Sequence, residues 1–204
     1  YYVDVPSIGR SWNFEIGPNV YSRAYKMAML GFYGQRCGTA VDLGPEFPGY
    51  KHPACHLKGE FHPSSGKSGE RDNVGGWHDA GDYGRYVVNS GISTGSLLWA
   101  WELYGSKLKD IKLHIPESGN GTPDILNEAR WNLEWMLKMQ DDDGGVWHKQ
   151  TSTKFSEFIM PQDDKLLSEI VGTGSAQYKS TCATVDLAAG SIVARIMAAS
   201  CAAM

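Results

Sequence analysis

The sequence has few cysteines and no excess of positive charge, and both shortages limit what the protein can be. Its 204 residues carry 19 Lys and Arg against 23 Asp and Glu, a net charge of −4. No basic field is therefore available to attract nucleic acid or an anionic membrane. Four cysteines at uneven spacing are too few for a disulfide framework. We expect no nucleic-acid partner, no membrane partner and no disulfide-rich scaffold.

Long apolar runs and a leader sequence are also missing. The longest apolar run, from Cys182 to Met204, contains Asp186 and Arg195 and is rich in Ala and Ser, which favours a core helix over a membrane span. Cys182 and Cys201 in this helix are predicted to be buried as small apolar side chains. No stretch has the pattern of a signal peptide, so we expect the chain to begin downstream of any such signal.

Aromatic residues, in contrast, are abundant, with seven Trp and ten Tyr. Flat and partly polar rings suit the recognition of sugars, whose apolar faces stack on them, although core packing uses the same residues. The hydrophobic content of 42% and the charged content of 21% are ordinary for a globular protein. The aromatic content is therefore the feature of the composition that favours carbohydrate binding.

Helical periodicity recurs along the chain after an extended start. Residues 1–16 alternate in the manner of a strand. The apolar spacing and the Gly, Pro and Asp signals then predict four helices: about Asn19–Arg36, Asp82 or Tyr83 to Tyr104, Thr122 to Asp141, and one starting at Ser180 or Thr181. The second of these is apolar nearly all round, which predicts an inner helix with protein on most sides.

One stretch contains residues suited to catalysis. From Gly75 to Asn89 it reads Gly-Gly-Trp-His-Asp-Ala-Gly-Asp-Tyr-Gly-Arg-Tyr-Val-Val-Asn. Asp79 and Asp82, flanked by Trp77 and Tyr83, suit the activation of a water molecule beside a bound sugar. A simpler interpretation is that the glycines make a turn, Asp82 caps the following helix and Asp79 is a solvated charge. Spacing alone leaves both interpretations open.

This run closely resembles the signature of glycoside hydrolase family 9, the cellulases built on an (α/α)6 barrel of twelve helices. Further pieces occur in the family's order: Tyr33-Gly34-Gln35-Arg36-Cys37-Gly38, Asn120-Gly121-Thr122-Pro123-Asp124-Ile125-Leu126, and Trp147-His148-Lys149. The resemblance covers roughly residues 17–194. It implies an all-α fold, namely the N-terminal portion (about four of twelve helices) of an (α/α)6 barrel, preceded by a short β segment.

The resemblance also implies an activity, the inverting hydrolysis of β-1,4-glucosidic bonds in cellulose. Asp82 would be the general base that takes a proton from the attacking water, and Asp79 would help to hold that water. A helix N-terminus at Asp82 would favour the ionised form that a base needs. Inversion requires acid and base about 6.5–9.5 Å apart, so two aspartates three residues apart should share the water side. Trp147 and His148 match substrate-binding positions.

The general acid of the family is a glutamate near the end of the catalytic domain. We therefore expect it to be missing from this chain, and expect little or no hydrolysis by these residues alone. Glu128 follows Asn127 as in the family's Asn-Glu acid motif, but packing and solvation inside a helix explain it, and we do not assign it as the acid. The alternative function is a non-catalytic, zinc-stabilised fragment that binds glucan. Endo or exo action, and cellulose, mixed-linkage glucan or xyloglucan as substrate, stay open.

The long irregular stretch from Gly38 to Gly76, with the residues at its two ends, contains a candidate metal site. Two thiolates and two imidazoles are the donors that a structural zinc ion takes, and some family members bind zinc with such a set. The predicted ligands are Cys37, Cys55, His56 and His78. A disulfide between Cys37 and Cys55 is the alternative, and His52 or His62 is an alternative fourth ligand.

An oxygen-rich loop predicts a calcium site at Glu117, Asn120 and Asp124, since some family members carry calcium. A turn followed by a capped helix explains the same residues. For domain organisation, the resemblance predicts that residues 1–16 are the last strand and linker of a preceding immunoglobulin-like module. Residues 17–204 would be the N-terminal part of the catalytic domain, in a secreted, extracellular protein with further modules in a longer parent chain.

Overall fold

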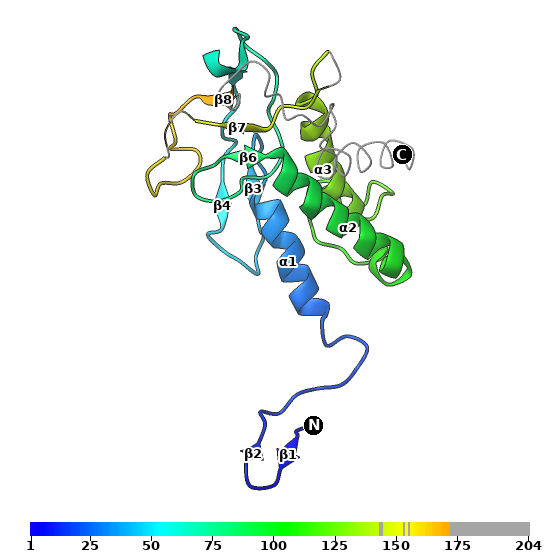
Figure 1. Cartoon of the computed structure of the whole chain (residues 1–204). Helices are drawn as coiled ribbons and strands as arrows, with labels where there is room; N and C mark the ends of the chain where they lie inside the picture. Colours follow the sequence, from blue (N-terminus) through cyan, green and yellow to red (C-terminus); the bar gives the residue numbers. More distant parts are fainter. Residues whose placement is uncertain (143–144, 153, 155, 172–204) are drawn as a thin grey trace.

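The computed structural model describes residues 1–142, 145–152, 154 and 156–171. This part of the chain combines three α-helices with short strands in three sheets (Figure 1). The helices are α1 (Ser22–Gly34), α2 (Val87–Leu108) and α3 (Asp124–Lys138), with a 3-10 helix η1 (Pro63–Ser65). The strands are β1 (Asp4–Val5), β2 (Gly9–Arg10), β3 (Val41–Asp42), β4 (Lys51–His52), β5 (Gly59–Phe61), β6 (Arg85–Tyr86), β7 (Lys149–Thr151) and β8 (Ser168–Val171).

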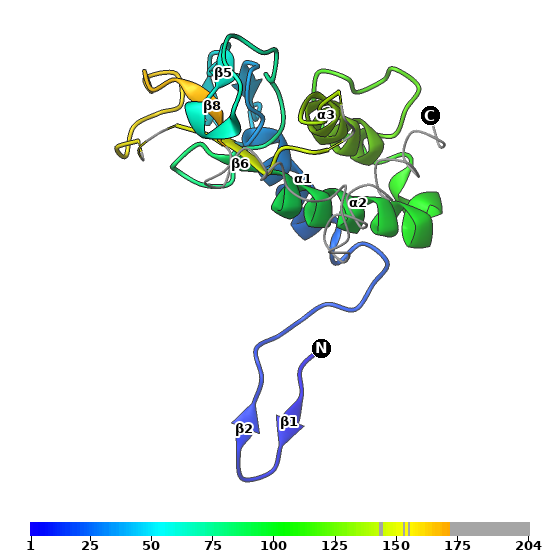
Figure 2. The same ribbon diagram turned by 45° about the horizontal axis from the view of Figure 1, so that its top comes forward.

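The largest sheet has four strands in the order β5-β8-β7-β6. Strand β8 runs parallel to β5 and antiparallel to β7, which in turn pairs antiparallel with β6. Strands β3 and β4 form a separate antiparallel pair, as do β1 and β2. The β1–β2 hairpin stands apart from the rest of the chain in both views (Figures 1 and 2). Its assignment to a preceding module stays a prediction.

Helix α3 connects two hydrophobic clusters, because its two ends bury different side chains. Its first half joins α1 and α2 through Ile125 and Ala129, and its second half contributes Leu133, Trp135 and Met136 to a cluster that reaches β8. The helix packs on both α1 and α2. The core is therefore continuous from the helices to the four-stranded sheet.

A buried ion pair lies where α1, α3 and the loop before β6 meet. The Arg36 guanidinium donates to the carboxylate of Glu128 at 3.2 and 3.0 Å and to that of Glu117 at 2.9 and 3.1 Å. The indole Nε1 of Trp77 donates to Glu128 Oε1 at 2.8 Å. Arg36 is 1% and Glu128 0% exposed. Burial by itself lowers the pKa of Arg36, but the carboxylates of Glu128 and Glu117 raise that pKa by more, so it lies above its ordinary value. Both carboxylate oxygens of Glu128 thus accept hydrogen bonds from other protein groups, consistent with leaving Glu128 out of catalysis.

The prediction of an all-α chain is wrong for the part that the structure describes, which is mixed α and β. The segments between helices contain paired strands of two to four residues. Strands so short carry too few residues for alternation to be visible. Their pairing also joins distant parts of the sequence, as in the register of Gly59 with Ser168. In the segments between the helices, the sequence therefore carries no periodic signal for these strands.

The helix boundaries also differ from those predicted. Helix α1 begins at Ser22 and ends at Gly34, inside the predicted range. Helix α2 begins at Val87, because the two residues before it pair with β7, so Asp82 neither caps the helix nor lies at its N-terminus. Helix α3 begins at Asp124, and its N-cap makes no side-chain hydrogen bond, so the predicted cap at Thr122 is wrong.

Helix α2 is not enclosed on most sides. Its buried face consists of Val87, Ser90, Gly91, Thr94 and Leu97, whereas Trp99 and Leu103 are each 71% exposed. The prediction of an inner helix is therefore wrong for one face. The predicted fourth helix, with Cys182 and Cys201, lies outside the described residues. Among the helices that are described, none combines the length and apolar character needed to cross a membrane.

We predict that Glu128→Gln destabilises the chain by up to about 3–5 kcal/mol, because removing one partner of a buried ion pair is costly. The buried Arg36 would keep only the partly exposed carboxylate of Glu117. The matched control on the same helix is Glu134→Gln. Its carboxylate pairs with Arg130 at 3.2 Å, and both side chains are about half exposed. That change should cost no more than about 0.5 kcal/mol. Denaturant unfolding measures the free energy of unfolding of both variants. An equal loss of stability in Glu128→Gln and Glu134→Gln would contradict the role of the buried pair.

Candidate functional site

A short antiparallel pairing brings the end of α1 against the residues before the two aspartates. Residues 35–37 lie alongside residues 76–78, with a β-bridge between Arg36 and Trp77. The amide of Cys37 donates to the carbonyl of Gly76 at 2.9 Å, and the amide of His78 donates to the carbonyl of Gln35 at 2.8 Å. The same pairing therefore places one cysteine and one histidine of the predicted metal set next to each other.

The loop that leads into this pairing is held by a buried guanidinium. Arg85 Nη1 donates to the carbonyls of Asn73 and Gly75, at 3.0 and 2.5 Å, and Arg85 is 0% exposed. Gly76 has a φ of +76°, and a Cβ there would lie 2.7 Å from the Trp135 ring. Only glycine satisfies both conditions, so this part of the motif needs glycine for backbone geometry and packing.

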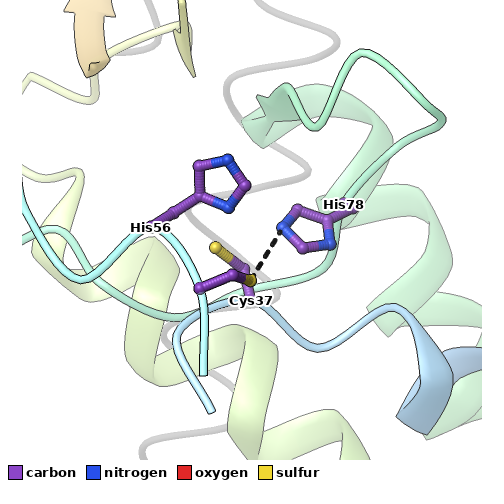
Figure 3. A group of neighbouring side chains, drawn as sticks. Cys37, His56 and His78 are labelled. Atoms are coloured by element: carbon purple, nitrogen blue, oxygen red, sulfur yellow. Dashed lines mark hydrogen bonds between the residues drawn. The ribbon is translucent and has the colours of Figure 1, made fainter. Parts of the chain in front are cut away.

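The four predicted zinc ligands lie together. Figure 3 labels three of them, Cys37, His56 and His78. One ligand atom from each of Cys37, Cys55, His56 and His78 lies within 4.8 Å of the others. Cys55 Sγ and His78 Nε2 are 3.8 Å apart. Three of the four residues are buried and His56 is partly buried. They come from the end of α1, the loop after β4 and the loop before β6, so the site joins three distant segments.

The alternatives for this cluster do not occur in the structure. Cys37 and Cys55 are both free thiols rather than a disulfide. His52 Nδ1 contacts the carbonyl oxygen of Pro53 at 2.7 Å, and His62 Nδ1 accepts from the backbone amide of Ser64 at 3.1 Å. His78 is therefore the fourth member of the cluster.

The protonation states of the cluster are set by burial and by contacts within it. Burial raises the pKa of the Cys37 thiol well above its ordinary value. The hydrogen bond from Cys37 is the main reason that the pKa of Cys55 falls to about 2. Burial lowers the pKa of His78. Both shifts, the lowered pKa of Cys55 and the lowered pKa of His78, favour the forms that bind a metal ion, a thiolate and a neutral imidazole.

The two aspartates lie on a tight turn that follows His78. The amide of Asp79 donates to the carbonyl of Gly84 at 2.8 Å, which closes the turn. Asp79 Oδ1 accepts from Asn89 Nδ2 at 3.2 Å, and Asp82 Oδ2 accepts from the Tyr86 hydroxyl at 3.0 Å. Asp79 is exposed and Asp82 half-buried. Both carboxylates thus face neutral donors and keep lone pairs open to solvent.

A cavity of about 280 Å³ lies beside this turn. Asp79 lines it together with Tyr86 and Asn89, and His78 forms another part of the wall. The cavity therefore borders both the metal cluster and one of the two aspartates. This arrangement provides a place where water and a polar ligand can reach Asp79.

Sequence reasoning missed the roles of Tyr86 and Asn89. Both lie inside the motif, and each donates a hydrogen bond to one of the aspartates. Gly84 permits the first contact, because a Cβ there would lie 2.9 Å from the Tyr86 hydroxyl and 3.1 Å from Asp82 Oδ2. The motif contained these residues, but only the folded turn shows which aspartate each one contacts.

The predicted substrate-binding pair is divided between surface and core. His148 is half-buried, and its carbonyl accepts from the amide of Val87 at 3.1 Å, beside the start of α2. Burial lowers the pKa of His148. Trp147 is 0% exposed and packs edge-on against Phe61, with ring centroids 5.8 Å apart. The ring of Trp147 is therefore part of the core, and its role in binding substrate stays a prediction.

The three predicted calcium ligands contact other protein groups. Glu117 pairs with Arg36, and Asp124 Oδ2 accepts from the Leu113 amide and the Ser118 hydroxyl at 2.7 and 2.6 Å. The side chain of Asn120 pairs with that of Asn127, at 3.1 and 3.2 Å. Across the described ranges, the Cys and His cluster is the one group of three or more Cys, His, Asp or Glu ligands that could hold a metal ion. Calcium stays a prediction.

Known proteins share the sequence of this chain over most of its length. Endoglucanase D of Acetivibrio thermocellus is 44% identical over 167 residues, covering 80% of this chain and 27% of that protein. The xyloglucan-specific endo-beta-1,4-glucanase BoGH9A of Bacteroides ovatus is 38% identical over 192 residues, covering 89% of this chain and 31% of that protein. The chain thus spans about three tenths of these curated relatives.

The same relationship appears in three dimensions. A solved structure described as a Zn-binding triple mutant of the glycoside hydrolase family 9 endoglucanase J30 superposes with a TM-score of 0.71 and 27% identity. The match covers 96% of this chain and 39% of that one. The sequence profile of glycosyl hydrolase family 9 matches residues 21–204. The chain belongs to glycosyl hydrolase family 9.

Proposed function

We propose that this chain carries the water-activating side of an inverting β-1,4-glucan hydrolase, with Asp82 as the general base and Asp79 as a second contact of the same water. The observation that carries the proposal is the turn itself. It presents two carboxylates, one of which, that of Asp79, lines a cavity, and each accepts a hydrogen bond from a neutral donor rather than an ion pair from a cation. A carboxylate in that setting keeps a lone pair free to accept a proton, as a base needs.

In the proposed step, one carboxylate oxygen of Asp82 accepts a proton from the water. The water oxygen then forms a bond to the anomeric carbon while the bond to the leaving sugar oxygen breaks. That oxygen takes its proton from a general acid on the opposite face of the sugar. Glu128 cannot supply the proton, because both of its oxygens are bound to Arg36 and it is fully buried. His148 is proposed to hydrogen-bond sugar hydroxyls on the side where α2 begins.

The proposed substrate is a β-1,4-glucan polymer. Support comes from the names of the relatives, an endoglucanase and a xyloglucan-specific endo-beta-1,4-glucanase. Cellulose and xyloglucan share the β-1,4-glucan backbone, so the chemistry at the cleaved bond is the same for both. Because a long polysaccharide cannot cross a membrane unaided, we propose that the protein acts outside the cell.

We predict that Asp82→Asn lowers kcat for a soluble β-1,4-glucan by roughly 10²–10⁴-fold with KM changed little, because the amide cannot accept the proton. Turnover is measured as reducing sugar in a full-length protein that carries this segment within a family 9 catalytic domain, since the chain spans only 27% to 31% of its relatives. Proton NMR of the first product should show the α-anomer, as inversion requires.

The control for this experiment is Asp110→Asn, whose side chain is 86% exposed just beyond the end of α2. Its kcat should equal that of the unmodified protein. An Asp82→Asn protein that keeps more than about a tenth of the original kcat, or a β-anomer as first product, would contradict the proposed mechanism.

We also propose that the Cys and His cluster is a structural zinc site. The donor set fits zinc, and the buried Nδ1 of His56 has no hydrogen-bond partner, as expected for an atom that faces a metal ion. Ligand separations of up to 4.8 Å are about 1 Å wider than the roughly 3.3–3.8 Å of a tetrahedral zinc site, so the side chains would close slightly around the ion. Bound there, zinc would crosslink three segments and leave no open position for chemistry.

We predict about one equivalent of zinc in the purified chain by elemental analysis. Removing the ion with a chelator should lower Tm. At a free zinc concentration of about 100 times Kd, binding adds about 2.7 kcal/mol to the free energy of unfolding. For a chain of this size, losing that contribution lowers Tm by roughly 5–11 °C. Cys55→Ser should abolish zinc binding, whereas His52→Ala should keep one equivalent. A purified chain without zinc, or with zinc lost only in the His52 variant, would contradict the site.

A further inference from the structure

The two ring nitrogens of His56 have different surroundings. Nε2 lies 3.3 Å from Asp164 Oδ2, a contact across 108 residues of sequence, and the two side chains are 5% and 3% exposed. Nδ1 is buried and has no hydrogen-bond partner. In Figure 3 one ring nitrogen of His56 points toward the sulfur atoms of the cluster and the other points away from them. The ring therefore stands between a carboxylate and the predicted metal position.

The backbone of His56 helps to fix this orientation. Its φ is +48°, a left-handed conformation that residues other than glycine rarely adopt. Such a conformation persists only where surrounding contacts hold it. The contact with Asp164 is one such contact, and a metal bond at Nδ1 would be another.

Asp164 is itself held firmly. Its Oδ2 also accepts from the Ser156 hydroxyl, and its Oδ1 accepts from the amide of Leu166 at 2.9 Å. Residues 156–166, which we call the Asp164 loop, thus form a local hydrogen-bonded unit around this carboxylate. A carboxylate with a nearly inaccessible side chain needs partners for all its lone pairs, and His56 supplies one of them.

A second contact ties the Asp164 loop to the cluster. The ring of Tyr83 packs against both imidazoles, with centroid distances of 5.5 Å to His56 and 5.0 Å to His78. The Tyr83 hydroxyl donates to the carbonyl of Ile159 in the Asp164 loop. The loop therefore reaches the cluster once through a carboxylate and once through a tyrosine that directly follows Asp82.

We propose that Asp164 is the positioning residue of the metal site: it accepts the Nε2 proton of His56 and so keeps the Nδ1 lone pair directed at the ion. This inference rests on the proposed zinc site. A metal-bound histidine almost always donates its other ring N–H to a carboxylate, a carbonyl or water, and loss of such a partner typically costs 10–100-fold in metal affinity. Because binding and ordering are linked, zinc also stabilises the Asp164 loop in its docked position.

The first test is zinc affinity. The metal-free chain and its variants are titrated with zinc alone against a chromophoric chelator at fixed pH. Asp164→Asn and Asp164→Ala should each raise the zinc Kd by about 10–100-fold. The matched control is Asp163→Asn, which changes the neighbouring, exposed carboxylate and should leave Kd unchanged. Circular dichroism checks that each variant keeps its helices.

The second test needs no variant and reports the histidine geometry directly. Long-range ¹⁵N–¹H NMR of the zinc-loaded chain should show His56 bound through Nδ1 with a proton on Nε2. Binding through Nε2, or an Asp164→Asn protein with the original Kd, would overturn the role of Asp164 while leaving the zinc site in place. A chain that takes up no zinc would overturn the site and this role together.

Discussion

The buried guanidinium of Arg36 is the constraint on which the rest of the structure depends. It lies just beyond α1, and its carboxylate partners come from α3 and the loop before it. Trp77 adds a hydrogen bond to the same carboxylate of Glu128. A buried pair of this kind adds little net stability, but neither charge can be left alone without a large cost. The three segments must therefore meet in one arrangement.

That arrangement sets the position of both candidate sites. Arg36 is followed by Cys37, and Trp77 is followed by His78 and Asp79, so the pairing around the ion pair places one residue of the candidate metal cluster on each of the two paired segments. Residues 79–84 form the turn that presents the two aspartates. The candidate metal cluster is mostly buried, as expected for a site that orders the backbone. The two carboxylates are at least partly open to solvent, as expected for groups that contact water.

Tyr83 is the residue through which the two sites contact one another. It follows Asp82, takes a left-handed φ of +54°, and packs on both histidines of the cluster. A metal ion held by those histidines would limit the movement of Tyr83 and, through the backbone, that of Asp82. The irregular stretch after Cys37 thus brings Cys55 and His56 back to the turn that holds Asp79 and Asp82.

The sequence by itself determined the family and pointed to the two candidate aspartates and the four members of the candidate metal cluster, because these depend on residue identity and local spacing. Only the tertiary structure decided that Asp82 precedes a strand rather than a helix, that Trp147 is in the core, and that His78 rather than His52 or His62 joins the cluster. It also brought Asp164 to His56. These outcomes depend on contacts between residues far apart in the chain, such as Arg36 with Glu128 and β5 with β8, and such contacts leave no periodic pattern in the sequence.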